Sequence, residues 1–312
     1  MESNRDNLQF RAALSGDAAA LYALAKSEGG NERLDPQFLR HWYFENPSGS
    51  FSIESAWQGP AAVGMATSNN FRFRIDGAHR LVAMPQNVVT ARAARGKGLF
   101  SKLYFRTEAA NRAAGADTFL TFTNALSTPI FLEKFGYRRA HCPDVLLYPF
   151  NPLALFARLR FRSLAGLHEM TIGAVYQPEN ALQKDAAWFA WRYASYRDGM
   201  IRLVEVADGS NVLGTLLFKK EKKKGLPFLL LMDVVASSEE DIRALLQAAP
   251  AAASRMGAPF LLMYDAVGVK AGGLHLRIRN RFNLLVKGRD VADTAHLART
   301  DFNLFFGDMD IV

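Results

Sequence analysis

The stretch TARAARGKGLF, residues 90–100, joins an extended apolar run to a long amphipathic helix. Its middle part, Arg95 to Gly98, places two glycines and two cations directly before that helix. Free backbone N–H groups and the helix dipole attract anions to a helix N-terminus, and glycines let a ligand approach the backbone closely. The stretch therefore suits a phosphorylated ligand, although a solvated basic turn and a nucleic-acid patch are alternatives at this point.

Neither of the two common nucleotide motifs is present in this stretch. The third glycine of the dinucleotide pattern is absent, and so is the Gly-Lys-Ser/Thr of a P-loop. Another basic run, Lys219 to Lys224, is closed by Gly225 and Pro227 and has no aromatic residues that could stack on bases. That run is typical of an exposed hairpin connection, so the sequence argues against a nucleic-acid partner.

Composition indicates an ordinary globular protein. The chain has 312 residues, of which 49% are apolar and 22% charged, and its net charge of +8 favours anionic partners. Cys142 is the single cysteine, which excludes an internal disulfide, and the six histidines lack metal-binding spacing, so no metal is predicted. The sequence predicts no membrane span and no signal peptide, and we expect a cytoplasmic location.

The sequence contains a repeat with an offset of about 150 residues, found by comparing the chain with itself. The aligned pairs are Asp35 with Asp185, Phe38 with Trp188, Leu39 with Phe189, Tyr43 with Tyr193 and Gly64 with Gly214. Further along, Val88-Val89 aligns with Val234-Val235. So long a period indicates duplicated domains. We predict one domain over residues 1–150, a linker over 151–180 and a second domain over 181–312.

Local patterns predict alternating strands and helices, hence a mixed α/β fold. The expected strands of the first half are Leu8–Ala12, Phe51–Trp57, Ala62–Thr67, Leu81–Thr90 and Phe119–Thr123, and the expected helices follow Asp17 or cover Pro36–Phe44, Gly98–Ala114 and Pro129–Phe135. We expect Tyr137–Tyr148 to close the first domain with strands. The second domain is expected to repeat this order and to end in a strand at Phe302–Phe306.

Three blocks of the first half resemble the GNAT acyltransferase superfamily. FRAALSGDAAALYALA (10–25) is similar to its opening strand and helix, and VVTARAARGKGLFSKL (88–103) to its acyl-CoA signature, Gln/Arg-x-x-Gly-x-Gly/Ala. TNALSTPIFLEKFGY (123–137) is similar to the block that follows. In the signature, Phe100 stands where the family has a small residue. The resemblance implies two tandem GNAT-like domains, the second a degenerate copy.

The resemblance also implies a cofactor site and an activity. Backbone groups of Gly96, Gly98, Leu99 and Phe100 would hold the pyrophosphate of acyl-CoA, with Arg95 and Lys97 beside it; Val88, Val89 and Thr90 would pair with the pantetheine amides, and Asn124 would reach the pantetheine arm. The implied reaction transfers an acyl group, expected to be acetyl, from CoA to a small-molecule acceptor, an amine or an amino sugar.

Departures from the family pattern leave the catalytic residues unassigned. Leu132 stands where many relatives have a tyrosine that protonates the leaving thiolate, and Gln86-Asn87 stands where a carboxylate base is often found. Tyr43 and Glu45 could line the acceptor side, with a structural role as the alternative for Tyr43. A non-catalytic CoA-binding scaffold and a tRNA-dependent aminoacyl transferase of the same fold are the competing functions.

The second half differs at the position of the glycine turn. After Val234-Val235 it has Ala-Ser-Ser-Glu-Glu-Asp, residues 236–241. Three carboxylates at a helix N-terminus favour the helix but repel a pyrophosphate. We therefore expect acyl-CoA to bind in the first half alone.

Overall fold

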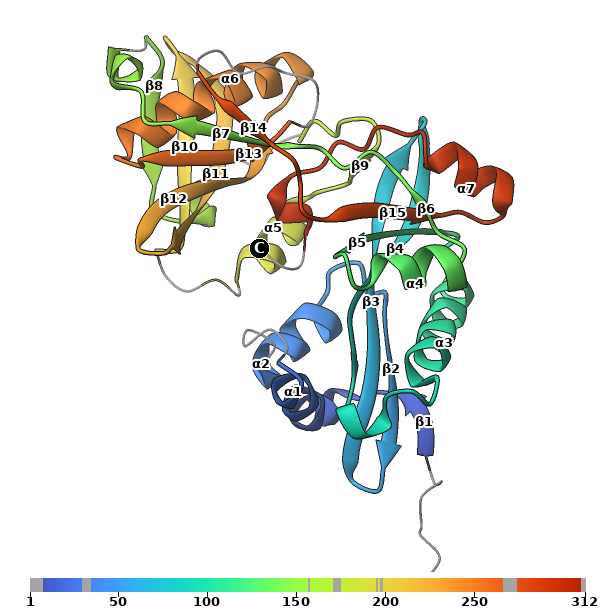
Figure 1. Ribbon diagram of the computed structural model, residues 1–312. Coiled ribbons are helices and arrows are strands. Elements are labelled where there is room, and N and C mark those ends of the chain that lie inside the picture. Colours follow the sequence, from blue (N-terminus) through green and yellow to red (C-terminus); the bar gives the residue numbers. More distant parts are fainter. Residues whose placement is uncertain are drawn as a thin grey trace, which may run out of the picture. The chain divides into compact units, whose positions relative to one another are not determined.

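A computed structural model describes residues 8–29, 35–156, 158–170, 175–194, 196, 199–265 and 274–309. The chain divides into two compact units (Figure 1). Unit 1 comprises residues 1–73, 79–140 and 284–299, and unit 2 comprises residues 74–78, 141–283 and 300–312. Both units therefore contain segments from both halves of the sequence.

Unit 1 is built on a mixed sheet with the strand order β1-β2-β3-β4-β5-β15-β6. Its strands are β1 (Leu8–Ala12), β2 (Phe51–Gln58), β3 (Ala61–Ile75), β4 (Ala78–Thr90), β5 (Thr118–Thr123), β15 (Asn283–Lys287) and β6 (Arg138–Arg139). Its helices are α1 (Ala18–Ser27), α2 (Pro36–Leu39), α3 (Leu99–Ala113), α4 (Thr128–Lys134) and α7 (Val291–Leu297). In Figure 1, α1 and α2 lie on one side of this sheet and α3 and α4 on the other.

Unit 2 has a second sheet, with the order β8-β10-β11-β12-β13-β7-β14. The strands are β8 (Arg160–Leu164), β10 (Ile201–Asp208), β11 (Asn211–Lys223), β12 (Leu226–Val235), β13 (Phe260–Tyr264), β7 (Val145–Pro149) and β14 (Leu276–Ile278). The unit also holds β9 (Ala181–Leu182) and the helices α5 (Ala186–Ala194) and α6 (Glu239–Arg255). Position by position, the two sheets have the same strand order.

The two halves of the sequence exchange one strand each. In unit 1 the position between β5 and β6 is taken by β15, which comes from the second half. In unit 2 the position between β13 and β14 is taken by β7, which comes from the first half and pairs from Val145 with Tyr264 to Pro149 with Phe260. Lys287 at the end of β15 forms an ion pair of 2.6 Å with Glu108 of α3, which ties the exchanged strand to unit 1.

Several boundaries differ from those predicted. The expected closing strands at 137–148 divide between the units, because β6 remains in unit 1 and β7 pairs in unit 2. The predicted linker contains β8, an arginine-bearing edge strand that pairs with β10. The strand expected at Phe302–Phe306 is wrong: Asn303 forms an isolated bridge with Ala181, and Phe306–Asp308 is a 3-10 turn.

The paired glycines of the repeat occupy the same structural position. Gly64 on β3 stands opposite Ala56, and Gly214 on β11 stands opposite Val206, and in both cases the strand register shifts at the next residue. A Cβ at Gly64 would press on Leu103 of α3, and one at Gly214 would overlap the carbonyl oxygen of Val235 and approach Leu245 of α6. Glycine is therefore required where each sheet bulges toward its long helix.

Replacement of Leu285 tests whether β15 belongs to unit 1. This β15 side chain is fully buried among residues of β5, α3 and α4. Leu285→Ala should lower the free energy of unfolding by about 3 kcal/mol, the usual cost of emptying such a core site. Hydrogen exchange measured by mass spectrometry should speed up in β5 and leave β13 protected. Faster hydrogen exchange in β13 instead would contradict the placement of β15 in unit 1.

Candidate active site

The site predicted from the sequence begins where β4 and β5 separate. These strands are parallel, and among the described residues they pair at two positions, Val82 with Thr118 and Ala83 with Phe119. Pro85 follows in β4 and has no N–H to donate to a ladder. Its carbonyl accepts a hydrogen bond of 2.9 Å from the Thr121 hydroxyl of β5. Beyond that contact the two strands diverge.

The end of β4 carries the three residues expected to face the pantetheine arm. Val88, Val89 and Thr90 are half-buried and lie past the last pairing with β5. The hydroxyl of Thr90 is buried and makes no hydrogen bond to any described residue. A buried polar atom without a partner is costly, and a bound polar ligand would satisfy it. This observation fits the expected cofactor.

The glycine turn has the conformation expected of a phosphate site. Gly96 has a φ of +77° and Gly98 a φ of +72°, and a Cβ at either position would meet open space. Gly98 is the N-cap of α3, and no side chain caps this helix. The N–H groups of the first turn, at Leu99 and Phe100, therefore have neither helical nor side-chain partners. The 15-residue helix directs its positive end to this turn.

The two cations of the turn have different surroundings. Arg95 donates to the carboxylate of Glu28 at 2.6 Å and to the carbonyl oxygen of Thr90 at 3.2 Å. The same carboxylate accepts from the backbone N–H of Arg92 at 3.0 Å, so Glu28 holds the start of the turn. Lys97 is exposed. Both side chains are exposed, but Arg95 is held by Glu28 and fixes the loop.

The departure at Phe100 has a packing explanation. Its ring stacks on Phe135, the residue that follows α4, with a centroid distance of 5.7 Å, and it meets Phe131 of α4 edge-on at 6.4 Å. The side chain thus turns into the aromatic cluster and leaves its backbone N–H at the helix start. Leu132 packs against the same cluster. An aliphatic side chain there supplies no proton to a leaving thiolate.

Asn124 follows β5 and has a local structural role. Its side-chain oxygen accepts hydrogen bonds of 3.0 Å from the backbone N–H groups of Leu126 and Ser127, which organises the entry to α4. Its Nδ2 group is the donor that a ligand could still use. A contact with the pantetheine arm stays a prediction.

Tyr43 and Glu45 lie in very different environments. The ring of Tyr43 is fully buried, and its hydroxyl contacts Thr67 of β3 and Asn87 of β4. Glu45 is exposed and pairs with His41 at 2.9 Å. The hydrogen-bonded cluster around Tyr43 includes Asn87 of β4, which has a positive φ. The sequence did not reveal this cluster, because its bonded pairs are 19 to 44 residues apart.

The equivalent helix of unit 2 has the opposite character. The hydroxyl of Ser238 caps α6 by accepting from the N–H of Asp241 at 3.1 Å, and three carboxylates occupy the first turn. Glu239 pairs with Arg243, and this hydrogen bond lowers the pKa of its carboxyl. A capped, acidic helix start repels phosphate.

In unit 2 the backbone just past β12 has a hydrogen-bond partner from the chain itself. β12 and β13 pair at Leu229 with Leu261 and Leu230 with Leu262, the same extent as in unit 1. Past the end of β12, the carbonyl oxygen of Ala236 accepts a hydrogen bond of 2.8 Å from the backbone N–H of Tyr176. The Tyr176 hydroxyl donates to Glu239 at 3.2 Å. We call residues 175–184 the strap.

A buried ion cluster fixes the end of the strap. The ammonium of Lys184 pairs with Asp233 of β12 and, at 2.6 Å, with Asp308 near the C-terminus. The hydroxyl of Tyr193 on α5 donates to the other oxygen of Asp233. Burial raises the pKa of Asp233 to about 6, against the opposing effect of Lys184. The cluster ties α5, β12, the strap and the C-terminal turn together.

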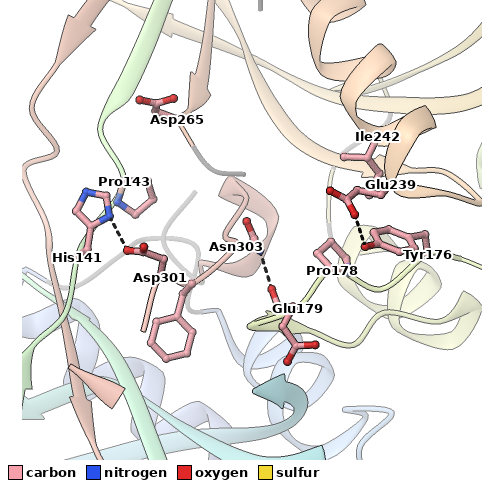
Figure 2. A pocket seen from close by; sticks show the side chains of 11 residues that line it. His141, Pro143, Tyr176, Pro178, Glu179, Glu239, Ile242, Asp265, Asp301 and Asn303 are labelled. Atoms are coloured by element: carbon pink, nitrogen blue, oxygen red, sulfur yellow. Dashed lines mark hydrogen bonds and ion pairs between the residues drawn. The ribbon is translucent and has the colours of Figure 1, made fainter. Parts of the chain in front are cut away.

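A pocket of about 560 Å³ remains beside the strap in unit 2. Figure 2 shows carboxylates around it, from Glu179, Glu239, Asp265 and Asp301. Of these, Glu179 pairs with Arg74, Glu239 with Arg243 and Asp265 with Arg277. The acidic lining does not suit a phosphorylated ligand.

Two further features concern metals and membranes. Within the described ranges, no group of three or more His, Cys, Asp or Glu side chains is placed to hold a metal ion. Among those same residues, no helix has both the length and the apolar character of a membrane span.

Comparisons with known proteins place the fold. No family model matches the chain and no curated protein is similar to it in sequence. A GCN5-related N-acetyltransferase from Anabaena variabilis ATCC 29413 superimposes with a TM-score of 0.66 at 15% identity, covering 94% of this chain and 75% of that one. A GCN5-related N-acetyltransferase from Kribbella flavida superimposes with a TM-score of 0.62 at 16% identity, covering 94% of this chain and 74% of that one.

A third solved structure agrees with these two. It is a conserved protein of unknown function from Enterococcus faecalis V583, described as a probable N-acyltransferase, with a TM-score of 0.62 at 9% identity over 92% of this chain and 74% of that one. All three cover both units of the chain. The resemblance inferred from the three sequence blocks is confirmed for the fold: the chain has the mixed α/β fold of the GCN5-related N-acetyltransferases.

Proposed function

We propose that the protein is an N-acyltransferase that uses acyl-CoA, with acetyl-CoA as the expected donor, and that unit 1 holds the site. The observation that carries this proposal is the junction of the diverging β4 with the uncapped start of α3, where two left-handed glycines leave the backbone open. The fold shared with N-acetyltransferases supports the same reaction class.

The residues of unit 1 would divide the cofactor between them. The N–H groups at the start of α3 would bind the pyrophosphate, helped by Lys97. Backbone groups of Val88 and Val89 would pair with the pantetheine amides, and the Thr90 hydroxyl would gain the partner that it lacks. Such pairing would hold the thioester in a fixed orientation for attack. Asn124 would contribute its Nδ2 group.

In the proposed reaction the acceptor nitrogen forms a bond to the thioester carbonyl carbon, the carbon–sulfur bond breaks, and CoA leaves as the thiolate. The proton lost by the amine passes to solvent. A small-molecule amine or amino sugar is the proposed acceptor. Backbone N–H groups at the end of β4, past its pairing with β5, would stabilise the oxyanion that develops on the carbonyl oxygen.

Leu132 favours a second candidate function. Its aliphatic side chain packs against the aromatic cluster at the position where relatives carry a proton-donating tyrosine. A protein that binds CoA without turnover would have this feature. The two candidates share the site and differ in whether thiol is released.

A thiol-release assay separates the two candidates. Full-length protein with acetyl-CoA and a panel of amines and amino sugars should release free CoA thiol in proportion to acetylated acceptor, detected by mass spectrometry. Binding of acetyl-CoA with no thiol release from any acceptor would favour the non-catalytic candidate.

Gly98→Ala tests the phosphate site. The new methyl group meets open space within the protein, but it would stand where the phosphate approaches and would strain a φ of +72°. We expect CoA affinity to fall at least about tenfold, or about 1.4 kcal/mol, by calorimetry. Gly115→Ala at the other end of α3 is the matched control, because its φ of +92° brings similar strain away from the site. Equal losses in both variants would refute the site.

The number of CoA sites per chain tests the proposed role of unit 2. Because the strap and the acidic start of α6 occupy the equivalent cleft, calorimetry should give one site per chain. Gly98→Asp, which places a carboxylate at the phosphate, should abolish all binding. A second site in the unaltered protein, or one site surviving in the variant, would show that unit 2 binds CoA.

A further inference from the structure

Two irregular backbone segments meet beside the thioester end of the proposed site. Arg40–Phe44, after α2, forms a π-helical turn in which the N–H of Glu45 bonds to the carbonyl of Arg40 at 3.2 Å. Within β4, Asn87 has a φ of +40°, a left-handed conformation that non-glycine residues seldom adopt. Such conformations persist only where neighbouring contacts hold them, and they concentrate at functional sites. The hydroxyl of Tyr43 contacts Asn87 and so joins the two segments.

The hydrogen bonds around Tyr43 have a fixed order of donors and acceptors. Asn87 donates from Nδ2 to the Tyr43 hydroxyl at 3.0 Å, and Thr67 donates from its hydroxyl to the carbonyl of Gln86 at 2.9 Å. Since the Thr67 proton is committed to that carbonyl, the 2.6 Å contact between Tyr43 and Thr67 requires Tyr43 to donate. The Tyr43 proton thus points at Thr67 of β3.

This orientation rules out one role and favours another. A fully buried hydroxyl that donates to Thr67 is not placed to protonate a leaving thiolate. The Tyr43 hydroxyl instead bonds to β4 in two ways: directly to the Asn87 side chain, and through Thr67 to the carbonyl oxygen of Gln86. Trp42 adds a bond of 2.8 Å from its indole N–H to the Gln86 side chain. The left-handed conformation of Asn87 is therefore held from the π-helical turn.

We propose that Tyr43 is a positioning residue for acyl transfer: its hydroxyl fixes the left-handed turn of β4 at Asn87 and thereby aims the backbone N–H groups of Val88 and Val89 at the acyl thioester. The inference rests on the proposed function of unit 1. It concerns the acyl end of the donor, whereas the pyrophosphate site lies at the start of α3.

Unit 2 supplies an internal comparison. Tyr193, the repeat partner of Tyr43, is also buried on a helix and also bonds to β12 directly before the two valines, through Asp233. There the carboxylate pairs with Lys184 of the strap, so the equivalent position is closed by an internal ion pair. In unit 1 the same position holds the uncharged Asn87, whose side chain donates to Tyr43. A tyrosine-to-phenylalanine change in unit 2 thus removes a similar hydroxyl with no acyl group nearby.

The test compares acetyl-CoA with CoA in three variants and one control. Tyr43→Phe should lower kcat with the acceptor found in the thiol-release screen by about 10- to 100-fold, the effect of a small misplacement of a reacting group. Affinity for CoA should change less than twofold, while the preference for acetyl-CoA over CoA should be lost. Asn87→Gly keeps a residue suited to positive φ but removes the hydrogen bond to Tyr43. It should lower kcat and abolish the preference for acetyl-CoA over CoA, as Tyr43→Phe does.

The double variant makes the test specific. Tyr43→Phe and Asn87→Gly break the same hydrogen bond, so together they should reduce kcat no further than the stronger single change. The control, Tyr193→Phe, should leave kcat and the donor preference unchanged even if it lowers the free energy of unfolding. Additive losses, or equal effects of Tyr43→Phe and Tyr193→Phe on kcat, would overturn the positioning role. If the unaltered protein bound neither acetyl-CoA nor CoA, the proposed function itself would fail.

Discussion

The divergence of two parallel strands is the constraint on which the rest of the structure depends. When β4 leaves β5 after two paired positions, the backbone groups along its inner edge need other partners, because buried N–H and C=O groups are rarely left unpaired. Unit 2 has the same divergence between β12 and β13 and meets the need internally, with Tyr176 bonded to Ala236. In unit 1 the edge runs to Thr90, whose buried hydroxyl has no partner among the described residues. One unit is thus closed by its own chain and the other is suited to an extended ligand with amide groups.

The helix that follows each diverging strand reinforces the difference. In unit 1 the start of α3 has left-handed glycines and no side-chain cap, so its free N–H groups and dipole favour an anion. In unit 2, Ser238 and three carboxylates satisfy the start of α6 and reverse the local potential. Strand edge and helix end change together between the units, which is what specialisation of a duplicated fold would produce. This difference supports the proposal that acyl-CoA binds in unit 1 alone.

Much of the secondary structure of unit 1 could be predicted from local sequence patterns. The glycine turn, the helix after it, and the strands β1, β2, β4 and β5 follow from turn residues and periodicity, and the repeat located Gly64 and Gly214 at equivalent bulges. For β3 only Ala62–Thr67 was predicted, and the strand continues to Ile75. The exchange of β7 and β15 could not be predicted. Both are five-residue apolar strands, and nothing in so short a pattern specifies which parallel or antiparallel neighbour it joins. The Tyr43 cluster and the Lys184 cluster were missed for a related reason, since their members come together only through tertiary packing.

Hydrogen exchange of the full-length protein, followed by mass spectrometry with and without acetyl-CoA, tests the central claim most directly. If unit 1 binds the cofactor along β4 and at the start of α3, exchange should slow at residues 88–101 on addition of acetyl-CoA. Residues 234–242 of unit 2, which occupy the equivalent place, should exchange at the same rate in both states. Slower exchange at 234–242, or no change at 88–101 at saturating acetyl-CoA, would contradict the account.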